Sequence, residues 1–235
     1  MSFWGDVGRF FAANSGLLAD QAGRQVLLSL AAIGAAMVIA LPVGIVVGHL
    51  HRWSFLAING GNVLRALPTL AVIAIGIGIY GLGFVNIWVA LIILALPLVL
   101  TNTYVGVDGV QGELVEAAKG MGMNAWQIVW RVELPSAVPF IMAGVRTATV
   151  YVIATAYLAG FAGSPGTLGD IITNPGSFAL AGVMAASIVA VLLAFAAELI
   201  LAGLERLLTP RGLTYQRSAV TATSTTTTWQ NQGAH

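Results

Sequence analysis

The chain of 235 residues contains no cysteine, a single lysine and few charged residues of either sign. Without cysteine, a disulfide framework cannot form. The single lysine, Lys119, follows Glu116-Ala117-Ala118 rather than a glycine-rich turn, so the lysine-containing phosphate-binding loop of many ATPases is absent. Charged residues are 8% of the chain and hydrophobic residues 58%, which excludes an ordinary soluble domain, because that much apolar surface cannot be hidden in one.

Long uncharged stretches predict membrane-spanning helices, because about 20 apolar residues cross the hydrocarbon core. Such stretches follow Arg24, Arg65 and Arg146, and the one after Arg65 is long enough for two spans with a turn at 80–83. We therefore expect an all-α membrane protein, a polytopic bundle of about five core helices. The expected spans lie near 26–50, 57–80, 84–105, 138–160 and 180–205.

The basic residues predict the orientation, since the cytoplasmic side of a membrane protein is enriched in Lys and Arg. Two of them, Arg9 and Arg24, fall on one side of the membrane. Eight fall on the other: Arg52, Arg65, Lys119, Arg131, Arg146, Arg206, Arg211 and Arg217. We expect a multi-pass protein of the cell membrane with its N-terminus outside, its C-terminus in the cytoplasm and a long cytoplasmic loop over 106–137.

Three regions are expected along the chain. Residues 1–25 lack the features of a cleavable signal and are interpreted as an external interfacial segment. Residues 26–208 form the transmembrane domain. Residues 209–235 are rich in Thr and Ser without apolar periodicity, which predicts a disordered cytoplasmic tail.

The residues that could carry chemistry lack the context for it. The net charge of +1 comes without a basic patch, so no nucleic-acid partner is expected. His49, His51 and His235 have no carboxylate or cysteine partners at metal-ligand spacing, and the first two are interpreted as interfacial caps at a span end. We expect no catalytic site, metal or cofactor, and therefore no enzyme activity in this chain.

The loop over 106–137 is predicted to form a helix, a break and a second helix. The signals are a capping start at Asp108 with Gln111, a break at Gly120 and Gly122, a second start at Asn124 with Gln127, and a stop at Pro135. Ala117, Ala118 and Met121 share helical spacing and predict an apolar patch. Such a patch in water favours a partner.

This loop resembles the coupling loop of the permeases of ATP-binding-cassette (ABC) importers. The family pattern is Glu-Ala-Ala, three residues, Gly, nine residues, an aliphatic residue, any residue and Leu-Pro. The chain matches it at Glu116, Ala117, Ala118, Gly122, Val132, Leu134 and Pro135. The segments 65–69, 121–123, 132–135 and 143–148 look like the glycine betaine, carnitine and choline (osmoprotectant) branch, whereas 163–170 departs from the plainer Gly-Gly-Leu-Gly of that branch.

The resemblance implies a type I importer permease working by alternating access. Its partners would be a cytoplasmic ABC ATPase dimer that holds the ATPase activity, a second permease subunit, an extracytoplasmic substrate-binding protein and the membrane lipids. The implied coupling residues are the seven matched positions and Met121. The implied cargo is a compatible solute such as glycine betaine, choline, carnitine or proline, with selectivity residing largely in the binding protein.

Other readings remain open at this point. Methionine, phosphonate and sulfonate importers have permeases with the same loop. A secondary transporter or channel would need intramembrane charges to couple proton or ion movement. Only Arg146 and Glu198 are expected within the spans, which is too few for such a relay. A purely structural membrane subunit would leave the loop unexplained.

Two residue sets within the spans carry further expectations. Arg146 and Glu198 have matching depths and are expected to pair, although each could instead extend separately to the interface. Thr147, Tyr151 and Thr155 recur every four residues and share one helix face. We expect this face to line the translocation path, the alternative being ordinary packing between helices.

Overall fold

The structure is a computed structural model that describes residues 3–51, 54–164 and 166–208, and these residues form helices and no strand. Four helical stretches are long and apolar enough to cross a membrane, and one bent pair of helices can make a fifth span. The four contain α1 (Phe3–Leu50), α4 (Phe84–Asp108), α7 (Leu134–Thr155) and α9 (Pro175–Leu208). This confirms the expected all-α bundle.

The second expected span, 57–80, is not one straight helix. It is divided into α2 (Ser54–Ala66) and α3 (Thr69–Tyr80), which are bent by 83°. Pro68 explains the break: it has no N–H to continue a helix, and its ring disfavours the helical conformation for the residue before it. The hydropathy of the segment concealed this bend, because the apolar run continues through it.

Arg65 lies at this break. Its Nη2 donates to the carbonyl oxygen of Pro97 on α4 at 3.1 Å. Arg65 is the basic residue in the last turn of α2, eleven residues or about 17 Å along the helix from Ser54.

Helix α1 continues through the expected boundary between residues 25 and 26. It is kinked at Asn14, whose φ of −122° and ψ of 21° are not helical. On the N-terminal side of the bundle, Val7 and Leu18 are buried in a small apolar cluster with Leu168 and Ile171 of α8 (Leu168–Thr173). The first residues therefore pack with the rest of the bundle.

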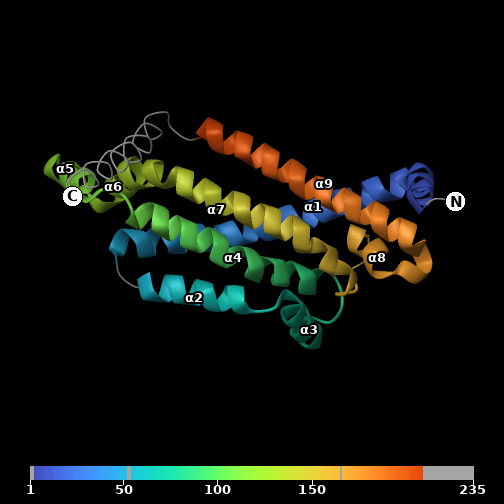
Figure 1. Ribbon diagram of the computed structural model, residues 1–235. Coiled ribbons are helices and arrows are strands. Elements are labelled where there is room, and N and C mark those ends of the chain that lie inside the picture. The colour runs from blue at the N-terminus through green and yellow to red at the C-terminus, as the bar shows by residue number, and fades with distance from the viewer. Residues whose placement is uncertain (1–2, 52–53, 165, 209–235) are drawn as a thin grey trace, which may run out of the picture.

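Helices α1, α4 and α7 lie side by side at the centre, with α9 on one side and α2 on the other (Figure 1). Small residues let these helices approach closely. A Cβ on Gly44 would lie 2.8 Å from the Cβ of Thr103, and one on Gly48 would lie 2.7 Å from the Cβ of Val107. The second half of α1 is therefore closely packed against the second half of α4.

The main core is built from alanine and branched side chains of the same helices. Ala32, Ala36 and Ala40, one turn apart on α1, are fully buried, and Ile87 and Leu91 of α4 belong to the same cluster. Between lipid-embedded helices the attraction comes from van der Waals packing rather than from the exclusion of water. The small residues thus set the distances between the helices.

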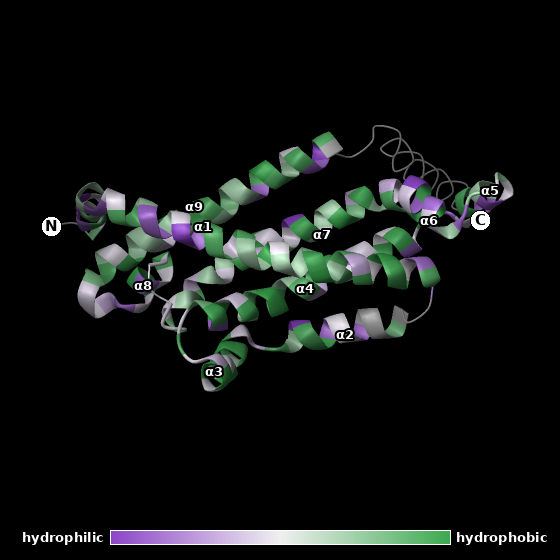
Figure 2. Cartoon of the chain, turned by 180° about the vertical axis from the view of Figure 1, so that it is seen from behind, coloured by the Kyte–Doolittle hydropathy of each residue, from purple (hydrophilic) through white to green (hydrophobic). Residues whose placement is uncertain are grey.

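The two ends of the bundle differ. The N-terminus and α8 lie at one end, and α5 (Gly112–Gly120) with α6 (Ala125–Ile128) lies at the other (Figure 1). Hydrophobic residues predominate along the long helices, whereas hydrophilic residues are more frequent near α5 and α6 and in the N-terminal part of α1 (Figure 2). The expected disordered tail, 209–235, lies outside the described residues.

Candidate functional site

The predicted loop forms an elbow that projects from the end of the bundle opposite the N-terminus (Figure 1). We use "elbow" for residues 109–133, which connect α4 to α7. The elbow consists of α5, a short turn, α6 and η1 (Val129–Glu133), a π-helical turn that continues into α7. The expected sequence of a helix, a break and a second helix is confirmed.

The turn of the elbow depends on Gly122. Its φ is +79°, a left-handed conformation that glycine adopts freely and that other residues adopt at a cost. The backbone N–H of Met123 donates to the carbonyl of Ala118 at 3.1 Å, closing the end of α5. The motif therefore has glycine at this position because the turn requires a left-handed backbone conformation.

A capping box starts the second helix of the elbow, as the sequence predicted. The backbone N–H of Gln127 donates to Asn124 Oδ1, and the backbone N–H of Asn124 donates to Gln127 Oε1, both at 2.9 Å. Two other predicted signals are wrong. Asp108 is the last residue of α4 and accepts a hydrogen bond from the Tyr104 hydroxyl, and Pro135 lies in the first turn of α7 instead of ending a helix. The backbone is helical on both sides of Pro135, which directly follows the π-helical turn η1, so this proline does not end the helix.

The exposed apolar side chains of the elbow differ from the expected patch. Ala117 is exposed and Met121 is 71% exposed, but Ala118 is 1% exposed. Its inclusion in the exposed patch is therefore wrong, because adjacent helical residues point about 100° apart and Ala118 faces inward.

Larger side chains extend the exposed surface. Trp126 is 70% exposed and lies against Trp130, with ring centroids 5.5 Å apart. We call the following set the elbow surface: Leu114, Ala117, Met121, Trp126 and Trp130. The sequence did not indicate that the two tryptophans belong with Met121. They do so because the chain turns between α5 and α6, which places all three on the elbow.

The other matched positions flank this surface. Glu116 is exposed on α5, and Pro135 is exposed at the start of α7. Val132 is half-buried, and Leu134 packs against the main core. The motif therefore combines exposed positions with positions that fix the elbow to the bundle.

Glu133, between Val132 and Leu134, is 1% exposed. Nδ1 of His49, in the last turn of α1, lies 2.9 Å from both carboxylate oxygens of Glu133. Nε2 of His51 lies 4.0 Å from Oδ1 of Asp108. The two histidines expected to be interfacial caps thus contact the residues at the two ends of the elbow, which local sequence could not indicate.

Arg146 and Glu198 lie together between α7 and α9. Arg146 Nε donates to Glu198 Oε1 at 2.8 Å, Nη2 contacts the same oxygen, and Nη1 donates to Glu205 Oε2 at 3.0 Å. Glu205 was missed in the sequence, although its place seven residues after Glu198 puts it on the same face of α9.

The face of α7 with Thr147, Tyr151 and Thr155 is turned outward in the single chain. Thr147 and Tyr151 are exposed and Thr155 is half-buried. The Thr147 hydroxyl donates to the carbonyl of Ala143 in its own helix at 2.8 Å, so it makes no hydrogen bond to a neighbouring helix with that proton.

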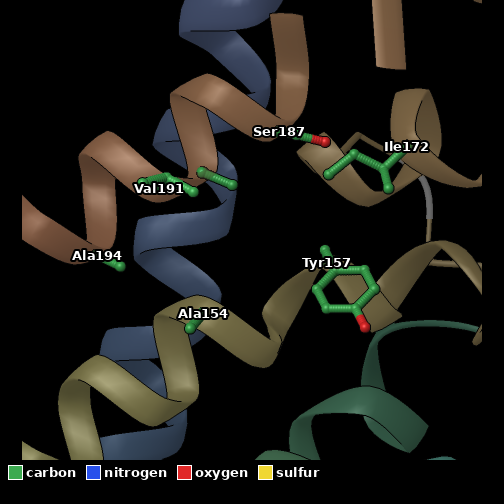
Figure 3. A pocket seen from close by; sticks show the side chains of 7 residues that line it. Ala154, Tyr157, Ile172, Ser187, Val191 and Ala194 are labelled. Atoms are coloured by element: carbon green, nitrogen blue, oxygen red, sulfur yellow. The ribbon is translucent and has the colours of Figure 1, made fainter. Parts of the chain in front are cut away.

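An apolar cavity of about 340 Å³ lies close to this face (Figure 3). It is formed where the end of α7 and η2 (Ala156–Gly160) meet α8 and α9. Its lining consists of Ala154, Tyr157, Ile172, Ser187, Ala190, Val191 and Ala194. None of the three residues expected on the path belongs to this lining.

A bundle of apolar spans that presents a structured, exposed elbow at one end defines a membrane protein with a docking surface outside the spans. Residues 40–214 match the family described as binding-protein-dependent transport system inner membrane component, and the chain belongs to that family. It is thus the multi-pass inner-membrane permease component of an ABC importer, and not a catalytic subunit.

Two curated relatives extend over nearly the whole chain. The glycine betaine/carnitine/choline transport system permease protein OpuCB of Bacillus subtilis is 36% identical over 209 residues, covering 87% of this chain and 94% of the relative. The carnitine transport permease protein OpuCB of Listeria monocytogenes is 37% identical over 205 residues, covering 87% and 94%.

The fold is similar to that of a solved importer. A chain of the MetNI methionine ABC transporter in an inward-facing conformation superposes with a TM-score of 0.71. The match covers 84% of this chain and 99% of that one at 21% identity. It bears out the expected type I importer permease fold.

Proposed function

We propose that this permease moves a compatible solute, such as glycine betaine, choline, carnitine or proline, into the cell. The support is the identity of 36–37% to permeases named for such solutes, together with the matching segments around the elbow. The methionine transporter shares the fold at 21% identity, which carries no argument for methionine as cargo.

The observation that carries the mechanism is the elbow surface. Exposed Met, Leu and Trp side chains on a short, capped projection favour burial against another protein, and aromatic residues are enriched at the centres of such interfaces. In this proposal the elbow docks on a cytoplasmic ABC ATPase dimer, which holds the ATP sites. Glu116 offers an exposed carboxylate to a basic group on that subunit.

The remaining partners follow from the importer class. A second permease subunit completes the path, and an extracytoplasmic substrate-binding protein delivers the solute. ATP binding favours one arrangement of the permease pair and hydrolysis the other, so the path opens alternately to the two sides. The outward-turned face of Thr147, Tyr151 and Thr155 lines that path between the two subunits.

The orientation in this proposal has the N-terminus outside and the elbow in the cytoplasm. Lys119 and Arg131 lie on the elbow and Arg206 near the end of α9, whereas Arg9 and Arg24 lie on the N-terminal half of α1. An excess of Lys and Arg marks the cytoplasmic side. Residues 26–208 form the permease domain, to which 1–25 is joined through the continuous α1.

The test is transport by the reconstituted complex. The permease, its ATPase and its binding protein are placed in vesicles, and uptake of labelled glycine betaine, choline, carnitine, proline and methionine is compared with and without ATP. We expect ATP-dependent uptake of one or more of the first four. Uptake of methionine alone would overturn the solute assignment. Uptake at the same rate with and without ATP would overturn the mechanism.

A matched pair of variants tests the elbow. Ala117→Glu puts a charge on the exposed elbow surface, whereas Lys119→Gln changes an exposed residue on the opposite side of α5. We expect Ala117→Glu to weaken ATPase binding and solute-stimulated ATP hydrolysis, and Lys119→Gln to leave both near normal. An Ala117→Glu complex that transports at the normal rate would rule out the elbow as the coupling element.

A further inference from the structure

The two ends of the elbow both lie near the C-terminal end of α1. The elbow leaves the bundle after Asp108, the last residue of α4, and re-enters it at Glu133, directly before α7. His49 contacts Glu133, with Nδ1 2.9 Å from each carboxylate oxygen, and His51 approaches Asp108 at 4.0 Å. The elbow therefore contacts α1 as well as α4 and α7, the two helices that it connects in sequence.

Glu133 is the unusual member of this set. A carboxylate buried to this extent is costly unless it is paired, and His49 is the partner that the described residues provide. His49 lies in the last turn of α1, where a positive charge is favoured by the helix dipole. Replacing a buried ionisable pair with apolar residues is often neutral or stabilising, so burial alone does not account for this pair.

The backbone supports the same contact. Glu133 ends the π-helical turn η1, and π-helical turns are rare and are frequently found at functional sites. On the α1 side, His49 follows Gly48, which lies against Val107 of α4 with no space for a side chain. The ends of α1 and α4 are thus packed as one body at this point.

We infer that His49 and Glu133 are positioning residues that link the α7 end of the elbow to the joined ends of α1 and α4. This inference rests on the proposed coupling function of the elbow. With the link intact, a displacement of the elbow surface moves both of its ends and α1 together. Without it, the α7 end of the elbow loses its side-chain contact with α1, and more of the displacement is absorbed locally.

The test measures the number of ATP molecules hydrolysed per solute taken up by the reconstituted complex of permease, ATPase and binding protein. His49→Leu removes the ring nitrogen that contacts Glu133. We expect this variant to assemble and hydrolyse ATP while its ratio rises about fivefold or more, the lower end of usual couplings between two sites. His49→Asn is the matched control, because its amide N–H can replace Nδ1, and we expect a ratio near that of the unaltered protein.

The double variant His49→Glu with Glu133→His distinguishes a specific contact between the two side chains from a role in packing. The exchange keeps both groups in reversed places, so it should restore the ratio to within about twofold of the unaltered value, as expected for residues that act as a pair. An assembled His49→Leu complex with a normal ratio would overturn the inference. So would an exchange variant that assembles but stays uncoupled, or failure of both variants to assemble, which would assign the pair to folding.

The proposed function and this inference fail in different ways. If the unaltered complex takes up no compatible solute, the proposed function fails before the variants are compared. If the unaltered complex transports and Ala117→Glu abolishes coupling, while His49→Leu behaves normally, the elbow keeps its role and only the link from His49 to Glu133 is rejected.

Discussion

Arg146 of α7 and Glu198 of α9 are joined by a hydrogen bond of 2.8 Å from the arginine Nε to the carboxylate, although they are 52 residues apart. Glu205, two turns further along α9, takes a second bond from the same guanidinium at 3.0 Å. One arginine thus contacts two carboxylates along the contact between α7 and α9. Because both acids share one cation, removing the cation is expected to be more disruptive than removing either acid.

The first prediction follows from this arrangement. Arg146→Leu removes the cation that Glu198 and Glu205 share and should lower the melting temperature of the detergent-solubilised permease. Glu198→Gln should lower it less, since Glu205 still pairs with Arg146. Scanning fluorimetry measures the melting temperatures of both variants. An Arg146→Leu variant that melts at the temperature of the unaltered protein would contradict the prediction.

The second prediction concerns the turn of the elbow. Gly122→Val forces a β-branched residue into a left-handed conformation, at a cost of about 1–2 kcal/mol, and should misdirect α6. We expect normal membrane insertion and a loss of solute-stimulated ATP hydrolysis. Gly120→Val is the control, because Gly120 has an ordinary helical φ and open space around it. Equal hydrolysis rates in the two variants would contradict the role of the turn.

The third prediction concerns the elbow surface. Trp126 is exposed and lies against Trp130, so Trp126→Ala removes one ring without disturbing the core of the bundle. If the ring is a central contact with the ATPase, its loss should weaken binding by about 2 kcal/mol, which is roughly 30-fold. Titration of the purified ATPase onto the permease measures this. Trp4→Ala, at the opposite end, should have no effect on that binding.

The fourth prediction concerns the packing of α1 against α4. A Cβ on Gly48 meets Val107 at 2.7 Å, so Gly48→Val should overpack the contact and destabilise the permease by about 1–3 kcal/mol. Gly34→Val is matched to it, because Gly34 lies on the same helix with nothing within 4 Å of its Cβ. Thermal denaturation in detergent compares them, and similar melting temperatures would show that the close approach is not needed.

The fifth prediction concerns the outward face of α7. The chain has no cysteine, so single cysteines can be introduced without removing any. Cysteines at Thr147, Tyr151 and Thr155 should react with water-soluble thiol reagents during transport if the face lines the path. A cysteine at Leu199, an exposed apolar position of α9, is the lipid-facing comparison and should stay unreactive. Three unreactive positions would assign the face to packing or lipid.

Sequence reasoning recovered what depends on local pattern. Charge-free stretches gave the spans, and the glycines with Asn124 and Gln127 gave the shape of the elbow, because turns and caps are fixed by neighbouring residues. The contact of His49 with Glu133 could not be predicted, since it joins residues 84 positions apart through the packing of α1.

Three other features that the sequence analysis did not predict do have a signal in the local sequence. Pro68 marked the break between α2 and α3, but the apolar length of the segment was given more weight. Ala118 was grouped with Ala117 by composition, although neighbouring helical residues point in different directions. Glu205 had the spacing to join Arg146 and was overlooked.

The break at Pro68 also constrains how the bundle sits among its surroundings. The helical hydrogen bonds of α2 end at this break, where the N–H of Leu67 donates to the carbonyl of Leu64 at 3.4 Å, and the Arg65 guanidinium donates to the carbonyl of Pro97 on α4. If the α2–α3 bend lies within the hydrocarbon core, as the expected span 57–80 implies, its irregular backbone and Arg65 must be covered by protein or water rather than by acyl chains.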